Sequence, residues 1–145
     1  MHSKDLTKEA PRSAYTTING YSILARAIDK GRATIAGTNG EYSFDCPVDN
    51  MLLAFTGIKG DDLKAVLAEG KSDDEIGAWV KEHSVPHTDE EIKAWNEHFH
   101  HDFSYATDPQ KSGWFIGECT RLGLDPMTTT LFTMLDADDK ATFAK

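Results

Sequence analysis

The stretch G-Y-S-I-L-A-R-A-I-D-K-G-R-A-T-I-A-G-T-N-G-E-Y-S-F-D-C-P-V-D, residues 20–49, contains the first long helix that the sequence predicts and most of the charged residues that could form a site. Apolar side chains recur in it at intervals of three to four residues, the spacing of one helix face. They are Tyr21, Leu24, Ala25, Ile28 and Ile35. Gly37 suits the left-handed residue that ends a helix. The pattern therefore predicts a helix over 21–36.

A β-hairpin is the alternative for part of this stretch. Tyr42 and Phe44 alternate with polar residues, and Asn39-Gly40 is a dipeptide that favours tight hairpin turns, so 33–38 and 41–45 could pair as strands. The helix, for its part, places Gly31 in its interior, which costs about 1 kcal/mol relative to alanine. We expect the helix, together with at most one small hairpin near 38–44.

Start signals for further helices follow along the chain. Cys46-Pro47 predicts a helix start, because proline has no N–H to lose at the first helical position. Ser72-Asp-Asp-Glu75 and Thr88-Asp-Glu-Glu91 are capping boxes, in which a hydroxyl and a glutamate satisfy each other's backbone N–H groups. The sequence therefore predicts an all-α fold, an irregular orthogonal bundle of five to seven short helices. The expected core residues are Leu24, Ile28, Phe55, Leu63, Val66, Trp79 and Trp95.

The chain of 145 residues is long enough for one domain with a real core. Residues 1–19 are mixed and polar and contain Pro11, so we expect an N-terminal arm that lies across the body; a disordered tail is the alternative. Residues 20–145 are predicted to form a single helical domain.

Charge and composition exclude several classes of protein. The net charge of −9 argues against binding to nucleic acids or to anionic membranes, because both require a cationic surface. The sequence has no apolar run near twenty residues and no apolar core of a signal peptide. Two cysteines do not make a disulfide scaffold, so a reduced cytoplasmic protein is expected. Whether it is a monomer or a homodimer stays open.

Arg32 lies in the middle of the apolar face of the first predicted helix. A guanidinium on a buried face is costly unless a carboxylate or a ligand anion pairs with it. Asp29 is one helical turn from both Arg26 and Arg32 and could bridge the two. We therefore expect either a pocket for an anion or an internal network of ion pairs.

For a pocket, the side-chain chemistry suggests roles. Arg26, Arg32 and Asp49 would bind the ligand, since a guanidinium grips a carboxylate or phosphate through two parallel hydrogen bonds. The candidates for proton transfer, polarisation or nucleophilic attack are Asp29, Lys30, Glu41, Tyr42 and Cys46.

Cys46 is the candidate nucleophile among these residues. A position at a helix start and nearby cations lower the pKa of a thiol, whereas the carboxylates of Asp45 and Asp49 oppose this effect. Cysteines are also common as small buried packing residues. The sequence does not decide between the two roles, and Cys119 in an apolar segment is expected to pack.

The sequence predicts no metal site and no cofactor. On one helix the three histidines of Glu97-His-Phe-His-His101 point in different directions and cannot converge on one ion. The acidic run that begins at Asp136 has alanine where a calcium loop needs glycine. Motifs that bind nucleotides are absent from the sequence.

Six short motifs together resemble a bacterial family catalogued as a domain of unknown function, number five-zero-six-nine. The motifs are P-R-S at 11–13, G-Y at 20–21, I-D-K-x-R-A at 28–33, G-E-Y at 40–42, C-P-x-D at 46–49 and D-x-E-I-x-x-W at 73–79. The resemblance implies a small standalone bacterial protein. It implies no reaction and no catalytic residues.

The expected function is binding or turnover of a small anionic metabolite, at a charged pocket between the first long helix and the G-E-Y and C-P-x-D segments. The alternative is a non-catalytic helical module that binds or regulates another protein. A concave pocket containing Arg32 favours the first, and a large exposed patch of tryptophan and phenylalanine favours the second.

Overall fold

The computed structural model describes residues 3–144 and confirms the all-α class. Within these residues seven α-helices form, at the upper end of the predicted range. Their bounds are α1 Leu24–Ala36, α2 Pro47–Thr56, α3 Gly60–Leu67, α4 Asp73–His83, α5 Asp89–His101, α6 Ser112–Leu122 and α7 Leu131–Phe143. The chain folds as two compact units, and the boundary between Ile92 and Lys93 lies within α5.

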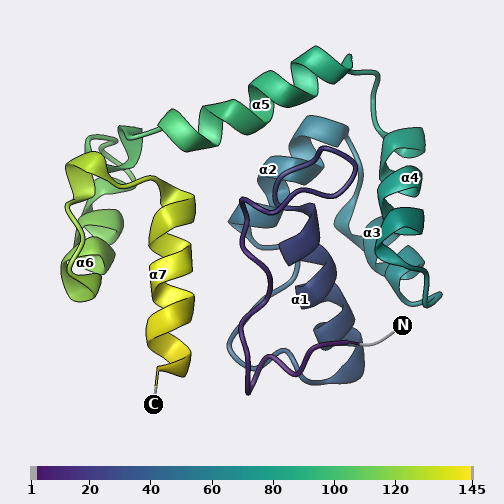
Figure 1. Cartoon of the computed structure of the whole chain (residues 1–145), viewed down its shortest axis with the longest axis horizontal. Helices are drawn as coiled ribbons and strands as arrows, with labels where there is room; N and C mark the ends of the chain where they lie inside the picture. The colour runs from purple at the N-terminus through teal and green to yellow at the C-terminus, as the bar shows by residue number, and fades with distance from the viewer. Residues whose placement is uncertain (1–2, 145) are drawn as a thin grey trace. The chain divides into compact units, whose positions relative to one another are not determined.

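The first unit is built around α1, which packs against α2, α3 and α4. Leu24, Ile28, Leu63 and Val66 are buried in it, as predicted. Figure 1 shows α1 with the purple N-terminal arm running along it. The nine residues of α1 that are buried include the charged side chains Arg26, Asp29 and Lys30.

Three of the predicted core aromatics are only half-buried. Phe55 stacks on the ring of His87, with centroids 3.9 Å apart, and Trp79 stacks on His83 at 4.4 Å. Trp95 instead meets the edge of the Phe99 ring at 4.9 Å. The apolar periodicity predicted that these rings face inward, but each ring lies at the edge of the core and stays partly exposed.

The helix ends follow the signals in the sequence. Cys46 is the N-cap of α2 and Pro47 its first residue, while Gly57 ends it in the left-handed conformation. Both predicted capping boxes form: Ser72 Oγ accepts from Glu75 N–H at 3.2 Å, and Thr88 Oγ1 accepts from Glu91 N–H at 3.0 Å. The two glutamates return the bond to the N-cap N–H groups at 3.0 and 2.8 Å.

The hairpin considered near 38–44 does not form. Residues 39–42 make a local turn instead, because Asn39 accepts from the Tyr42 N–H at 2.9 Å and donates its side-chain amide to the Tyr42 carbonyl at 2.8 Å. The tight hairpin turn of this protein lies earlier, at Asn19-Gly20. There Ile18 and Tyr21 exchange both backbone hydrogen bonds, at 3.1 and 3.0 Å.

That turn also explains why α1 begins at Leu24 rather than at Tyr21. Tyr21 is occupied in the turn, and the buried Ile23 enters the helix with φ of 74°, a conformation rare for a β-branched residue. The arm holds Ile23 there, since the Ile23 N–H donates to the carbonyl of Ala14 at 2.8 Å. The start of α1 therefore depends on the arm.

Gly31 is in the interior of α1 because two neighbours need the space. A Cβ at this position would collide with Leu67 of α3 and lie 3.2 Å from the ring of Phe44. The helix gives up about 1 kcal/mol of propensity and gains close packing of α3 on α1.

The second unit is organised around α6. This helix packs against α7 and against two 3-10 turns, η1 (Ser104–Ala106) and η2 (Pro126–Thr128). The buried hydrophobic residues of the second unit are Tyr105, Ala106, Phe115, Cys119, Leu131, Phe132 and Met134. No helix in the described part of either unit is long and apolar enough to cross a membrane.

Candidate functional site

Two clusters of charged side chains meet α1 in the first unit. The first, here called the arginine cluster, consists of Arg12, Asp29, Arg32 and Asp73. The second, the lysine cluster, consists of Lys30, Cys46 and Asp49. The arm, α1 and the start of α4 supply the first cluster, and α1 and α2 supply the second.

Arg12 connects the arm to α1. Its backbone N–H and its Nε donate to Asp29 Oδ2 at 2.8 and 3.0 Å, and its Nη2 donates to Oδ1 at 3.0 Å. Burial works to lower the pKa of Arg12, but the hydrogen bonds to Asp73 and Asp29 outweigh it and raise that pKa. Arg12 is therefore a permanent cation at this position.

Asp73, at the start of α4, is shared by two arginines. It accepts from Arg12 Nη1 at 2.8 Å and from Arg32 Nη1 at 2.9 Å. The hydrogen bond from Arg12 is the largest cause that lowers the pKa of Asp73, and Arg32 adds to it. The carboxylate is therefore ionised across the neutral range and ties the arm, α1 and α4 together.

The prediction that a carboxylate or ligand must accompany Arg32 is met here by Asp73 and by the carbonyl of Lys71, which accepts from Arg32 Nη2 at 2.9 Å. The prediction that Asp29 bridges Arg26 and Arg32 was wrong. The Asp29 carboxylate accepts hydrogen bonds from Arg12 instead. Sequence reasoning missed Arg12 and Asp73. Both stand in the motifs P-R-S and D-x-E-I-x-x-W, which was the only available signal for them.

Arg26 is buried beside the arginine cluster without sharing its carboxylates in the contacts described. Its Nη1 donates to the carbonyl of Arg12 at 3.3 Å, and its guanidinium lies 5.6 Å from the centre of the Tyr42 ring. Tyr42 is half-buried, while Glu41 is exposed. The predicted G-E-Y segment therefore contributes a ring beneath Arg26, and Glu41 points to solvent.

The two charged side chains of the lysine cluster are almost completely enclosed, whereas Cys46 is half-buried. The Lys30 side chain is 3% exposed and that of Asp49 is 1% exposed, and Lys30 Nζ lies 2.9 Å from Asp49 Oδ1. Lys30 Nζ also donates to Cys46 Sγ at 3.0 Å. The other Asp49 oxygen, Oδ2, accepts from the Asp45 N–H at 2.9 Å. Three predicted site residues from two helices thus come together in one place.

One detail of this cluster concerns Asp49 Oδ1. By distance it is in an ion pair with Lys30, yet among the described atoms it has no partner with the alignment of a hydrogen bond. The charge attraction needs no such alignment, so we regard the ion pair as the relevant contact. The lysine ammonium lies between a carboxylate and a sulfur.

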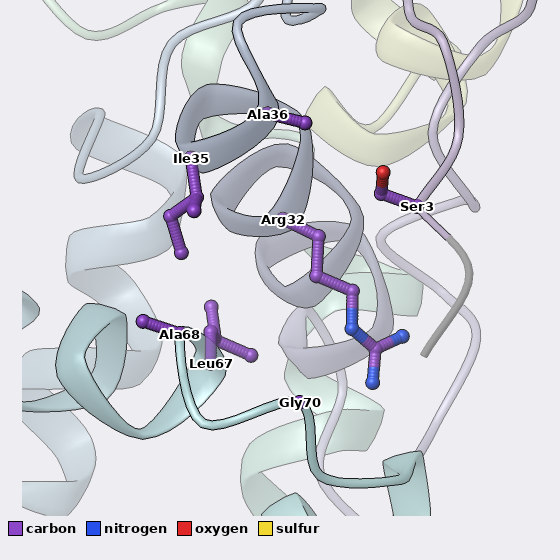
Figure 2. A pocket seen from close by; sticks show the side chains of 7 residues that line it. All are labelled: Ser3, Arg32, Ile35, Ala36, Leu67, Ala68 and Gly70. Atoms are coloured by element: carbon purple, nitrogen blue, oxygen red, sulfur yellow. The ribbon is translucent and has the colours of Figure 1, made fainter.

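An open pocket lies on the Arg32 side of α1. It has a volume of about 190 Å³ and is lined by Ser3, Arg32, Ile35, Ala36, Leu67, Ala68 and Gly70. Figure 2 shows Ile35, Leu67 and Ala68 on one side of the pocket and the Arg32 side chain extending toward Gly70. Arg32 is the one charged residue among these lining residues, whereas the lysine cluster does not contribute to the lining.

The predicted histidine-rich segment forms the end of α5 in the second unit. His98 Nε2 lies 3.3 Å from Asp102 and His101 Nε2 lies 3.8 Å from Glu97, as separate pairs one turn apart. Among residues 3–144 no three histidine, cysteine, aspartate or glutamate side chains gather in an arrangement that could hold a metal ion.

Comparison with protein families identifies the family of this chain. A family model described as "Domain of unknown function (DUF5069)" matches residues 8–141, which include both charged clusters and most of the pocket. No curated protein matches the chain.

Proposed function

This chain belongs to the DUF5069 family. From the geometry of its first unit we propose that the pocket beside Arg32 binds a small organic anion. The observation that carries the proposal is the position of one guanidinium in a pocket whose other side chains are a hydroxyl and four aliphatic groups. A cation with an aliphatic wall suits a ligand that has a carboxylate or phosphate at one end and a short apolar body.

Arg32 has donors available for such a ligand. A guanidinium carries five N–H donors. In the part of the chain that the structure describes, two of them bind Asp73 and the carbonyl of Lys71, which leaves three. The side chain is 9% exposed, so an anion that reaches it through the pocket would be partly shielded from water.

Asp73 holds Arg32 at the pocket but does not depend on Arg32 as its only cation. Asp73 also holds Arg12, so a ligand that drew Arg32 away would leave Asp73 with a cation. The cost of exchanging the carboxylate for a ligand anion is thereby reduced, because no charge is left buried alone. The pocket volume, about six times the ~30 Å³ share of a water molecule, restricts the ligand to a small metabolite.

Binding is the function proposed, in a cytoplasmic protein whose two cysteines are free thiols. Turnover would need a proton-transfer group or nucleophile at the ligand, and the candidates Lys30 and Cys46 belong to the other cluster. Asp29 is occupied by Arg12, and Glu41 and Tyr42 are not among the lining residues.

A thermal-shift screen against short-chain carboxylates and phosphate monoesters tests the proposal. A ligand at 100 times its dissociation constant raises the free energy of unfolding by about 2.7 kcal/mol, which gives a clear shift of the melting temperature. We expect a hit with the wild type, and we expect Arg32→Gln to abolish it.

The matched control is Arg12→Gln. Arg12 and Arg32 bind the same carboxylate, but only Arg32 lines the pocket, so Arg12→Gln should lower stability and retain the hit. Ala68→Phe places a ring in the pocket without changing a charge and should remove the hit. A hit that survives Ala68→Phe, or a blank screen with a folded wild type, would refute the pocket as the site.

A protein-interaction role is the second candidate, and the surface of the second unit favours it. Trp114 is 53% exposed and Met127 is 57% exposed, the two highest values among the large hydrophobic side chains of the described residues. A partner protein that binds the wild type and Ile35→Ser, but not Trp114→Ser, would support this role, because Ile35 is an exposed apolar control in the first unit.

A further inference from the structure

The contact between Lys30 and Cys46 has a chemical consequence that does not depend on the anion pocket. A primary amine and a thiol sulfur lie 3.0 Å apart, the amine on α1 and the sulfur at the N-cap of α2. The Lys30 side chain is 3% exposed, whereas Cys46 is half-buried. Cys46 is therefore the more open of the two residues to an oxidant, and Lys30 Nζ is already in place beside its sulfur.

We propose that the pair is a site of oxidative modification, at which a peroxide joins Lys30 Nζ to Cys46 Sγ by a covalent N–S bond. The oxidant is hydrogen peroxide or an organic hydroperoxide. The bond would link α1 to the first turn of α2 and would be reversed by thiols.

The chemistry takes two balanced steps. In the first, the sulfur of Cys46 attacks one peroxide oxygen; an S–O bond forms, the O–O bond breaks, and the thiol and hydrogen peroxide become a sulfenic acid and water. In the second, the neutral Lys30 amine attacks that sulfur; an N–S bond forms, the S–O bond breaks, and a second water leaves. Sulfur is oxidised by two electrons and the peroxide is reduced by two.

Asp49 provides the base that the second step needs. Its carboxylate lies 2.9 Å from Lys30 Nζ and can take the proton that the ammonium must lose before nitrogen can attack. The Asp45 N–H holds the other oxygen of Asp49 at 2.9 Å, so the carboxylate is fixed in position. The sulfur is held as well, because Cys46 is the N-cap of α2 and precedes a proline.

Cys119 provides the contrast within the same chain. It is fully buried in α6, and burial raises the pKa of its thiol, with Asp125 and Glu118 adding to the effect. A peroxide should therefore oxidise Cys46 well before Cys119.

The test is a mass measurement on Cys119→Ala, in which no intramolecular disulfide can form. The native protein is treated with hydrogen peroxide and digested with trypsin. The expected product is peptide 27–32 joined to peptide 33–59, lighter by two hydrogens than the two together, because a modified Lys30 is no longer cleaved. Dithiothreitol should release both peptides, and the melting temperature should rise on oxidation and fall again on reduction.

Two controls keep the result interpretable. Lys30→Arg retains a cation for Asp49 but offers a weakly nucleophilic guanidinium, and we expect Cys46 to oxidise without forming the link. Cys119→Ala protein treated in guanidinium chloride should also give no link, since the two side chains are then apart; this control does not require a further variant to fold.

Three outcomes would overturn the proposal. One is a native protein in which Cys46 becomes a sulfinic or sulfonic acid with no joined peptides. Another is a joined pair that retains an oxygen atom between nitrogen and sulfur. The last is an equal yield of the link in the unfolded chain. None of these bears on the anion pocket, whose test uses Arg32 and Ala68.

Discussion

Arg12 and Asp29 are joined by three hydrogen bonds, one from the Arg12 backbone N–H at 2.8 Å and two from its guanidinium at 3.0 Å. A residue of the arm thus satisfies a carboxylate on a buried face of α1. Removing Arg12 would leave the Asp29 carboxylate, whose side chain is 6% exposed, with little access to water. The arm is therefore part of the folded structure of the first unit rather than an addition to it.

Asp73→Asn should change how stability depends on pH. The folded-state pKa of Asp73 is below its ordinary value of 3.8, so its ionised form stabilises the fold above that value, and this contribution is lost as the pH falls through the lowered pKa. We expect the variant to be less stable than the wild type at pH 7 and the difference to shrink below about pH 4. Urea denaturation at several pH values measures this. Asp74→Asn, an exposed neighbour, should show no such convergence.

Lys30→Met should destabilise the protein strongly, because it leaves the carboxylate of Asp49 buried without its cation. Breaking a buried pair from one side costs about 3–5 kcal/mol, whereas replacing both partners by apolar residues costs far less. The double variant Lys30→Met/Asp49→Leu should therefore be more stable than Lys30→Met alone. Denaturant unfolding of the complete double-mutant cycle checks this. If the losses in free energy of unfolding from the two single variants simply add in the double variant, Lys30 and Asp49 do not stabilise each other.

Gly31→Ala should lower the stability of the protein and Gly117→Ala should raise it, although both glycines lie inside helices. At Gly31 the new methyl group meets Leu67 and Phe44, and overpacking of about 1–3 kcal/mol outweighs a gain in propensity of about 1 kcal/mol. Near Gly117 the described chain has no atom within 4 Å of the new Cβ, so only the gain remains. Melting temperatures of the two variants suffice, and stabilisation by Gly31→Ala would contradict the packing.

Gly20→Ala should destabilise the first unit by about 1–2 kcal/mol, since φ of 86° is costly for a residue with a Cβ. Thr17→Ala, an exposed change just outside the turn, serves as the control and should lie within about 0.5 kcal/mol of the wild type. Equal stability of the two variants would mean that the tight turn at Asn19-Gly20 is not needed.

The helices could be predicted because their ends are specified by residues that are close together in the sequence. Gly37, Pro47, and the pairs Ser72 with Glu75 and Thr88 with Glu91 each act within four residues, and the structure has all of them in the predicted roles. The hairpin considered as an alternative was at Asn39-Gly40, whereas the tight turn forms at Asn19-Gly20. Asn39 closes its turn with its own side chain, whereas Ile18 and Tyr21 flank the other turn and pair with each other.

The ion pairs could not be predicted in the same way. Arg32 was expected to have a carboxylate partner, but its partner Asp73 is 41 residues away, and Asp73 is 61 residues from Arg12. Nothing local distinguishes Asp73 from the adjacent Asp74 as the residue that faces α1. The pairing of Lys30 with Cys46 likewise depends on the angle at which α2 leaves the turn after residue 45, which no spacing in the sequence specifies.

The bond between Arg12 and Asp73 also constrains how the protein is made. A ribosome adding 5–20 residues per second reaches Asp73 about 3–12 s after it has placed Arg12. During that interval the arm and α1 exist as nascent chain without the carboxylate that joins them to α4. The first unit therefore cannot be completed in order from its N-terminus. Its earliest residues wait for the fourth helix, and this interval is when a chaperone would have the most exposed surface to bind.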